Sequence, residues 1–273
     1  MNEDRITARL RRHSPLIGDD CAIIKAPAGK DLLFTTDFTI EGVHFTRDLP
    51  ATQVGHRALL RGLSDIAAMG GTPKYCMVSL AVAPWAGERW TDDFYRGLLG
   101  LASQHKTQLA GGDLSHASQV VVDIVVYGVV QAGKALRRTG ARPGDRIWVS
   151  GALGGWHHQL NPKPQLAVGR KLIGRATACM DITDGLVLDL HRLCLASGVS
   201  GELEDIPLLK NATIEQAMFD GEDYALLFTS SKRTNPGFCI GSIVEGKPGR
   251  ILYQGKPLVP RGYDHFQSNS SVD

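Results

Sequence analysis

The sequence lacks the segments that mark membrane-spanning or secreted chains. No run of about eighteen apolar residues occurs in it, so no helix is expected to cross a bilayer. The first thirty residues carry charges throughout, and the apolar centre of a signal peptide is missing. An excess of either charge is missing as well, because 30 Lys and Arg face 28 Asp and Glu and leave a formal charge of +2. This balance gives no reason to expect nucleic acid or a membrane as a partner.

Cysteine is scarce, and its spacing fits neither disulfides nor zinc. The five cysteines are odd in number, lie far apart and form no CxxC pair. We interpret them as reduced thiols and expect a cytoplasmic location. The nine histidines include no HExxH motif.

The common nucleotide-binding fingerprints are also absent. The Gly29-Lys30 pair is not part of a Walker A loop, because Ile24 stands where the first glycine is needed and Asp31 where Ser or Thr is needed. We predict a hairpin turn there instead. Neither a GxGxxG loop nor the HRD and DFG motifs of protein kinases occur. If the chain handles ATP, it needs another architecture.

The composition is that of a folded chain with a sizeable core. Of 273 residues, 43% are hydrophobic and 21% are charged. Both halves mix predicted strands and helices without strict βα alternation, which favours an α+β fold. The turn-rich stretch Gln131–Asp145 lies near the middle, and we predict one domain over residues 1–135 and a second over 136–273.

Hydrophobic patterns predict the main elements. Runs rich in Val, Leu, Ile and aromatic residues predict strands at Asp31–Thr36, Tyr75–Ala83, Gln119–Val130, Arg146–Ser150, Cys179–Thr183, Tyr224–Thr229 and Phe238–Val244. Apolar residues at helical spacing predict helices over Arg57–Met69, over Asp92–His105, and from Leu186 to a stop at Gly198.

Many aspartates lie at the ends of these apolar elements, beside glycine or a hydroxyl residue. Strand ends and glycine turns are where a rigid scaffold presents reactive groups. Ordinary turn chemistry explains any single case equally well, and Asp184 is a candidate cap for the helix that follows it. Asp65 differs, because it lies in a predicted helix among leucines and alanines, where a lone carboxylate is costly unless it is paired.

If several of these aspartates converge, they need cations. Two unpaired carboxylates about 4 Å apart repel by roughly 4 kcal/mol at an effective dielectric near 20. Ligation by Asp and Thr oxygens alone suits Mg²⁺, which keeps waters and bridges phosphate oxygens. Carboxylates, Mg²⁺ and glycine turns together indicate nucleotide phosphate chemistry.

Taken in order, the motifs form a specific set. The first half contains Gly18-Asp19-Asp20-Cys21-Ala22, Thr35-Thr36-Asp37, Glu41-Gly42-Val43-His44-Phe45, Leu63–Gly70 and Gly111-Gly112-Asp113. The second half contains Arg138–Ala141, Pro143-Gly144-Asp145, Asp181–Leu186, Gly221–Tyr224 and Gly262–Phe266. The set resembles the thiamine-monophosphate kinase family from end to end.

The resemblance implies two mixed α/β domains of the type found in aminoimidazole ribonucleotide synthetase, selenophosphate synthetase and a hydrogenase maturation protein. It implies a homodimer in which the N-terminal sheets pair. The N-terminal domain is expected to bind ATP and metal, and the C-terminal domain to complete the site. The implied reaction converts ATP and thiamine monophosphate to ADP and thiamine diphosphate, by direct in-line transfer without a phosphoenzyme.

The resemblance also assigns roles to residues. The implied magnesium ligands are Asp20, Thr35, Thr36, Asp37, Asp65, Asp113 and Asp184. The implied ATP contacts are Gly112, Asp113, Arg138, Asp181 and Thr183, and the implied thiamine monophosphate contacts are His44, Glu222 and Tyr263. Several Mg²⁺ ions are expected, with K⁺ as a candidate activator. Because the acceptor is already a phosphate oxyanion, no strong general base is expected.

Some features depart from the family or leave alternatives open. The stretch between Gly155 and Asn161 is short, and Ala225 stands where the family often has Glu. His44 also fits an ordinary surface or half-buried loop histidine, and Tyr263 also fits a C-terminal aromatic packed on the domain. An ATP-dependent synthetase acting on a ribonucleotide amidine is a second hypothesis. A protein that binds nucleotide or thiamine phosphate without turnover is a third.

Overall fold

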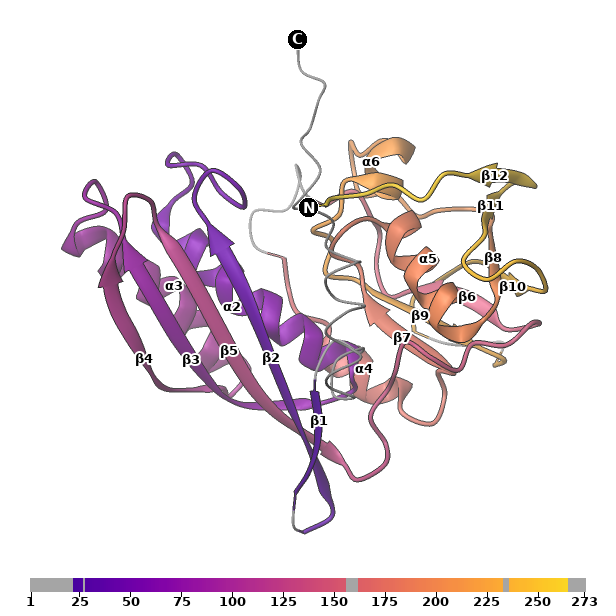
Figure 1. Ribbon diagram of the computed structural model, residues 1–273, viewed down its shortest axis with the longest axis horizontal. Coiled ribbons are helices and arrows are strands. Elements are labelled where there is room, and N and C mark those ends of the chain that lie inside the picture. The colour runs from indigo at the N-terminus through magenta and orange to yellow at the C-terminus, as the bar shows by residue number, and fades with distance from the viewer. Residues whose placement is uncertain (1–21, 27, 156–161, 233–235, 265–273) are drawn as a thin grey trace. The chain divides into compact units, whose positions relative to one another are not determined.

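The computed structural model describes residues 22–26, 28–155, 162–232 and 236–264, which form two compact units (Figure 1). The N-terminal unit consists of residues 23–135 together with 162–173. The C-terminal unit consists of residues 136–155 together with 174–264. Each unit has its own sheet, and helices cover part of it.

The sheet of the N-terminal unit has the strand order β1-β2-β5-β3-β4. Its strands are β1 (Ala22–Ala26), β2 (Lys30–Ile40), β3 (Thr72–Val82), β4 (Gln108–His116) and β5 (Val121–Gln131). β5 pairs antiparallel with β2 and β3, whereas β4 runs parallel to β3 at the edge. The turn between β1 and β2 is the hairpin that the sequence predicts.

The two faces of this sheet differ in burial. On β5 the residues Val122, Ile124 and Val126 are fully buried, and the residues between them are only half-buried. The buried face packs against α2 (Ala51–Ala68), and α3 (Glu88–Gln104) lies beside α2 on the same side (Figure 1). This alternation is the period of two expected when one face of a sheet is covered.

Glycines allow the helices of the N-terminal unit to pack backbone to backbone. A Cβ at Gly55 of α2 would lie 1.9 Å from Phe94 O, and one at Gly97 of α3 would lie 1.8 Å from Thr52 O. The short helix α4 (Leu166–Leu172) packs on α2 through Gly169, where a Cβ would lie 2.0 Å from Ala67 O. Each contact excludes any residue with a side chain unless the backbone shifts.

The C-terminal unit has a sheet of order β12-β11-β8-β10-β6-β9-β7. Its strands are β6 (Arg146–Val149), β7 (Ala178–Asp181), β8 (Ser200–Leu203), β9 (Leu226–Ser230), β10 (Phe238–Val244), β11 (Ile251–Tyr253) and β12 (Lys256–Leu258). Two helices accompany them, α5 (Leu186–Ser197) and α6 (Ile214–Phe219). Leu186, Leu190 and Leu193 of α5 are fully buried in the core of this unit. Gly198 ends α5 in the left-handed conformation, with φ of 71°.

The α+β prediction is confirmed, with three corrections of detail. The predicted strand Asp31–Thr36 ends before Asp37, but β2 continues through Asp37 to Ile40. The sequence predicts no strand around Gly111-Gly112-Asp113, but these residues lie within the edge strand β4. The helix predicted from Arg57 begins at Ala51, where Pro50 is the N-cap and no side chain caps the helix. Among the described residues, no helix is long and apolar enough to cross a membrane.

Candidate functional site

Two of the predicted metal ligands touch in the N-terminal unit. Thr35 of β2 donates its hydroxyl hydrogen to Oδ2 of Asp65 on α2. Thr35 stands opposite Val126 in the sheet register, so it belongs to the face that the helices cover. The carboxylate that the sequence marks as costly in its helix is therefore paired by a residue of the neighbouring sheet.

The sheet register sorts the remaining ligand candidates of this unit between two faces. Asp37 stands opposite Ile124, so it shares the covered face with Thr35. Thr36 points the other way and donates to Oδ1 of Asp123 at 2.5 Å. Asp113 is exposed and stands opposite Ser79, which in turn stands opposite Asp123. The structure therefore groups Thr35, Asp37 and Asp65 on one face, and places Thr36 and Asp113 on the other.

The close approach of strand β3 to the edge strand β4 requires glycine at position 112. A Cβ at this position would lie 1.9 Å from Val78 O on the neighbouring strand β3. Only glycine fits that distance without a backbone shift. Gly112 itself is exposed, so the backbone of β4 is open to a ligand at this point.

The loop after β2 carries His44 in a fixed orientation. His44 is buried, with 7% of its surface exposed, and its Nδ1 accepts the N–H of Ile40 at 3.0 Å. The bond leaves Nε2 as the protonated nitrogen of the neutral ring.

Glu41 anchors the start of the same loop, and sequence reasoning did not assign it a role. Its carboxylate accepts the N–H of Val120 at 2.8 Å and the indole N–H of Trp85 at 3.1 Å, and it pairs with Arg47. Burial by itself raises the pKa of Glu41, but these hydrogen bonds bring it below its ordinary value. Glu41 therefore ties the ends of β2, β3 and β5 together while it is charged.

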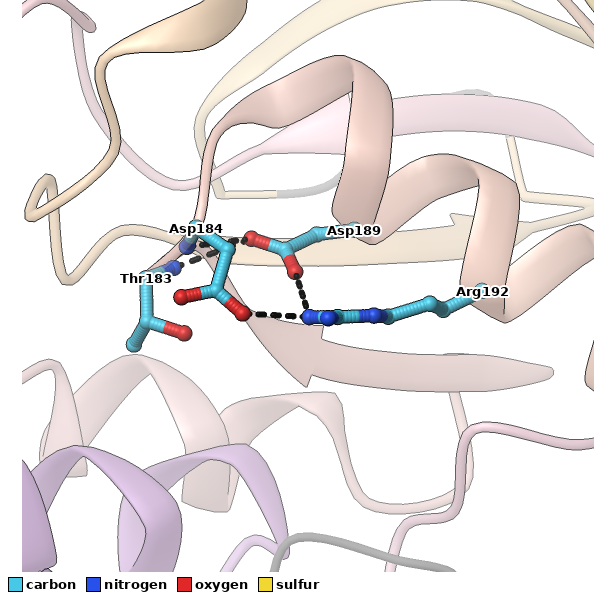
Figure 2. A network of polar contacts seen from close by, with 4 residues as sticks. All are labelled: Thr183, Asp184, Asp189 and Arg192. Carbon is cyan, nitrogen blue, oxygen red and sulfur yellow. Dashed lines mark hydrogen bonds and ion pairs between the residues drawn. The ribbon is translucent and has the colours of Figure 1, made fainter. Parts of the chain in front are cut away.

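A second cluster lies between β7 and α5 in the C-terminal unit. Figure 2 shows that Oδ2 of Asp189 accepts the N–H groups of both Thr183 and Asp184, each at 3.0 Å. Nη1 of Arg192 contacts Oδ2 of Asp184 and also lies 3.3 Å from Oδ1 of Asp189. Asp189 has no exposed surface. Burial and the neighbouring charge of Asp184 raise the pKa of Asp189 above its ordinary range, whereas Arg192 lowers it.

Sequence reasoning missed Asp189 and Arg192, although the sequence holds a signal for both. Asp189 is three residues after Leu186 and one before Leu190, so helical spacing places its carboxylate on the apolar side of α5. A cation three residues later is the partner such a position requires. The alternative that Asp184 caps α5 is wrong, because Gly185 is the N-cap and no side chain caps this helix.

Three motifs that are distant in sequence meet at the β7–α5 segment. The N–H of Glu222 donates to Thr183 O at 2.9 Å, and the N–H of Tyr224 donates to Ile182 O at 3.0 Å. The N–H of Tyr263 donates to Asp184 O at 2.9 Å. The structure thus brings Thr183, Asp184, Glu222 and Tyr263 together. Asp181 is buried at the end of β7, and Arg138 is half-buried in the segment before β6.

The Glu222 segment has a strained backbone. Glu222 and Tyr224 both have positive φ, at 54° and 53°, which is uncommon for residues with side chains. Asp223 between them is buried and accepts the N–H of Gly155 at 2.7 Å. Burial raises the pKa of Asp223 to about 7, and the charges of Asp220 and Glu222 act in the same direction. In this conformation Asp223 is buried and Glu222 is half-buried.

The described residues contain no complete metal centre. Within them, no group of three or more His, Cys, Asp or Glu side chains is arranged to hold an ion. The predicted ligand Asp20 lies outside the described residues, and Thr35 supplies a hydroxyl rather than a carboxylate. The donor atoms of Thr35, Asp37 and Asp65 are all oxygens, which is the donor type that Mg²⁺ prefers.

Known proteins match this chain along most of its length. Residues 18–130 match the model of the AIR synthase related protein, N-terminal domain. The thiamine-monophosphate kinase of Aquifex aeolicus is 33% identical over an alignment of 291 positions, which covers 93% of this chain and 94% of that protein. The chain belongs to the thiamine-monophosphate kinase family. The resemblance carried by the ordered motifs is thereby confirmed.

Solved structures agree with this family membership. The structure described as "AaThiL complexed with AMPPCP and TMP" has a TM-score of 0.90 and 30% identity, and the match covers 97% of each chain. The hydrogenase maturation protein HypE has a TM-score of 0.74 at 16% identity, over 95% of this chain and 98% of that one. HypE shows a common fold alone. The predicted relation of this kinase-family chain to the fold of a hydrogenase maturation protein is confirmed.

Proposed function

We propose that this chain transfers the γ-phosphoryl group of ATP to thiamine monophosphate and releases ADP and thiamine diphosphate. The observation that carries the proposal is the similarity, over 97% of the chain, to a kinase structure complexed with AMPPCP and TMP. We interpret these ligands as an ATP analogue and the phosphate acceptor. Each unit contains aspartates and hydroxyl groups, the oxygen donors that such chemistry needs.

A divalent metal ion, Mg²⁺ in our proposal, would neutralise the phosphate charges when it is bound. The touching pair Thr35 and Asp65, with Asp37 on the same face, is the part of the proposed ligand set that the geometry supports best. Thr36 and Asp113 belong to the other face of the sheet, and Asp184 belongs to the C-terminal unit. Their part in metal binding, that of Asp20, the number of ions and an activating K⁺ stay predictions.

Direct in-line transfer needs positioning and charge neutralisation more than proton abstraction, because the acceptor is a phosphate oxyanion. The proposed ATP contacts are Gly112, Asp113, Arg138, Asp181 and Thr183, and the proposed acceptor contacts are His44, Glu222 and Tyr263. The fixed ring of His44 and the shared backbone anchoring of Glu222 and Tyr263 support the second group. The cytoplasmic location predicted from the sequence stays a prediction.

We also propose that the N-terminal unit forms a homodimer through the open face of its sheet. Phe34, Tyr127 and Tyr75 stand in one row across β2, β5 and β3, with ring centroids 5.1 and 5.8 Å apart. On the same face Phe38 and Met77 are 57% and 47% exposed. Apolar patches of this kind are typical of protein interfaces.

Sedimentation velocity tests the dimer. We expect a dimer for the native chain and a monomer for Tyr75→Glu, because a charge in the interface core would be buried without a partner. Leu99→Glu is the control, since Leu99 is exposed on α3, away from the open face. A Tyr75→Glu variant that stays dimeric would contradict the proposed interface.

A direct assay tests the proposed reaction. Purified protein with Mg-ATP and thiamine monophosphate should form thiamine diphosphate and ADP in equal amounts, separated by chromatography. A ribonucleotide amidine in place of the acceptor should give no ADP, which distinguishes the synthetase hypothesis. Absence of thiamine diphosphate over a range of Mg²⁺ and K⁺ concentrations would overturn the proposal. Tight nucleotide binding without ADP release would instead favour a binding protein.

The Asp37→Asn variant tests the role of the covered face. We expect it to lose turnover while it remains folded, because a neutral amide is a poor ligand for Mg²⁺. Asp92→Asn, at an exposed position of α3, is the matched control and should keep full activity. An active Asp37→Asn variant would show that the metal assignment is wrong.

A further inference from the structure

We propose that Asp189 is a positioning residue, which fixes the Thr183–Asp184 segment in the geometry that binds a magnesium nucleotide. The inference rests on the proposed function. It concerns a buried carboxylate that contacts the backbone of this segment and is not itself expected to touch a ligand.

The burial of Asp189 requires a strong local reason. A carboxylate without exposed surface on the apolar side of α5 is unfavourable unless its oxygens are fully used. Both oxygens have partners around the turn between β7 and α5. Oδ2 accepts two successive backbone N–H groups, those of Thr183 and Asp184, and Oδ1 lies 3.3 Å from Arg192 (Figure 2).

Two successive N–H groups directed at one oxygen fix the backbone of this segment. Thr183 and Asp184 leave β7 and precede Gly185, whose φ of 115° permits the chain to turn into α5. Without the Asp189 carboxylate, these two part-buried N–H groups would lack their acceptor, and the segment would have to reorganise. Arg192 adds a second constraint, because the same Nη1 contacts the carboxylates of both Asp184 and Asp189.

The segment held by Asp189 is also the attachment point of two other motifs. Thr183 O accepts the N–H of Glu222, and Asp184 O accepts the N–H of Tyr263. Gly221 and Gly262 allow this close approach. A Cβ at Gly221 would lie 2.3 Å from Thr183 O, and a Cβ at Gly262 would lie 2.1 Å from Asp184 O. A displacement of the segment would therefore move the proposed nucleotide and acceptor groups together.

Asp145 offers a matched comparison in the same unit. It is also a buried carboxylate, and it accepts the N–H of Arg142 at 3.0 Å and the hydroxyl of Thr177 at 2.6 Å. None of these partners belongs to the proposed site. A purely structural role for Asp189 would make the two carboxylates behave alike.

The test compares Asp189→Ala, Asp189→Asn and Asp145→Asn by calorimetric binding of Mg-AMPPCP and by melting temperature. We expect Asp189→Ala to weaken binding at least about tenfold, since two hydrogen bonds that fix the segment are lost. Asp189→Asn should weaken it by about threefold at most, because the amide oxygen can still accept both N–H groups. Asp145→Asn should lower the melting temperature and leave the affinity unchanged. If Asp189→Ala does not fold, Asp189→Ser, whose hydroxyl is too short to accept both N–H groups, replaces it with the same expected loss.

Amide hydrogen exchange adds a measurement that does not depend on turnover. The N–H groups of Thr183 and Asp184 should lose protection in Asp189→Ala and keep it in Asp145→Asn. Unchanged affinity and unchanged protection in Asp189→Ala would overturn the proposal. It would also be overturned if Asp189→Ala and Asp145→Asn both lost affinity in proportion to their loss of melting temperature. A native chain that binds Mg-AMPPCP but transfers no phosphoryl group would overturn the proposed function alone. A native chain that does not bind Mg-AMPPCP would overturn both.

Discussion

The hydroxyl of Thr35 on β2 donates a hydrogen bond to Oδ2 of Asp65 on α2, thirty positions further along the chain. The bond joins two residues that the motif resemblance assigns to the set of magnesium ligands. Helix α2 packs on β2 and β5, so it holds Asp65 against the covered face of the sheet. The hydroxyl donor orients the carboxylate in its half-buried position.

We predict that Asp65→Asn lowers kcat by about 10²–10³-fold, a loss typical of removing one electrostatic group from a phosphoryl-transfer site. Thr35→Ser should stay within about threefold of the native kcat, because the hydroxyl donor is kept, whereas Thr35→Val should fall well below it. Steady-state kinetics at several Mg²⁺ concentrations measures both effects. Equal activity of the Ser and Val variants would show that the hydroxyl of Thr35 has no part in the reaction.

We predict opposite effects for two glycines of α3. Gly97→Ala should destabilise the N-terminal unit by about 1–3 kcal/mol, because its Cβ would lie 1.8 Å from Thr52 O. Gly100→Ala has no atom within 4 Å of the new Cβ and should stabilise the helix by about 0.5–1 kcal/mol. Urea unfolding of both variants checks the pair, and a stability loss at Gly100 equal to that at Gly97 would contradict the packing explanation.

We predict that Asp223 makes stability decline as pH rises from about 4 to above 7. Its pKa is about 7 in the folded chain and about 3.9 when unfolded, so the folded state holds the extra proton in this window. The free energy of unfolding of Asp223→Asn, measured relative to that of the native chain, should therefore increase by roughly 3 kcal/mol from pH 5 to pH 8. Denaturant unfolding at both pH values measures this gain.

The exposed Asp205→Asn variant is the control for this prediction and should follow the native chain. A difference between Asp223→Asn and the native chain that does not change with pH would mean that Asp223 titrates normally in the fold.

We predict that the cysteines of the described residues differ in their rate of alkylation. Burial raises the pKa of Cys76 to about 11 and that of Cys194 to about 12, so neither holds appreciable thiolate at pH 8. Cys239 is half-buried and should react with iodoacetamide first among the four free cysteines described. Peptide mass spectrometry of native and Cys239→Ser protein gives the order, and prior labelling of Cys194 would contradict it.

Local patterns in the sequence were enough to predict most elements. Leu59, Leu60 and Leu63 specify a buried helical face, and the alternating valines of β5 specify a strand with one covered face. The edge strand β4 escaped prediction because Gly111-Gly112 has the composition of a turn. Gly112 is required there by the nearness of Val78 O on β3, a contact that no local pattern contains.

The candidate site was only partly predictable for the same reason. The cost of Asp65 in an apolar helix was visible in the sequence, but its partner Thr35 was not. Asp189 could be recognised as a charge on an apolar face, yet its acceptance of two backbone N–H groups depends on how β7 turns into α5.

The sequence by itself determined the family, the α+β class and the types of residue available for phosphate chemistry, because these depend on composition, order and local periodicity. Only the tertiary structure decided which of those residues share a surface. Neighbouring residues of a strand point to opposite faces, so Thr35 and Thr36 separate although they are adjacent, and the strand register determines where Asp113 lies.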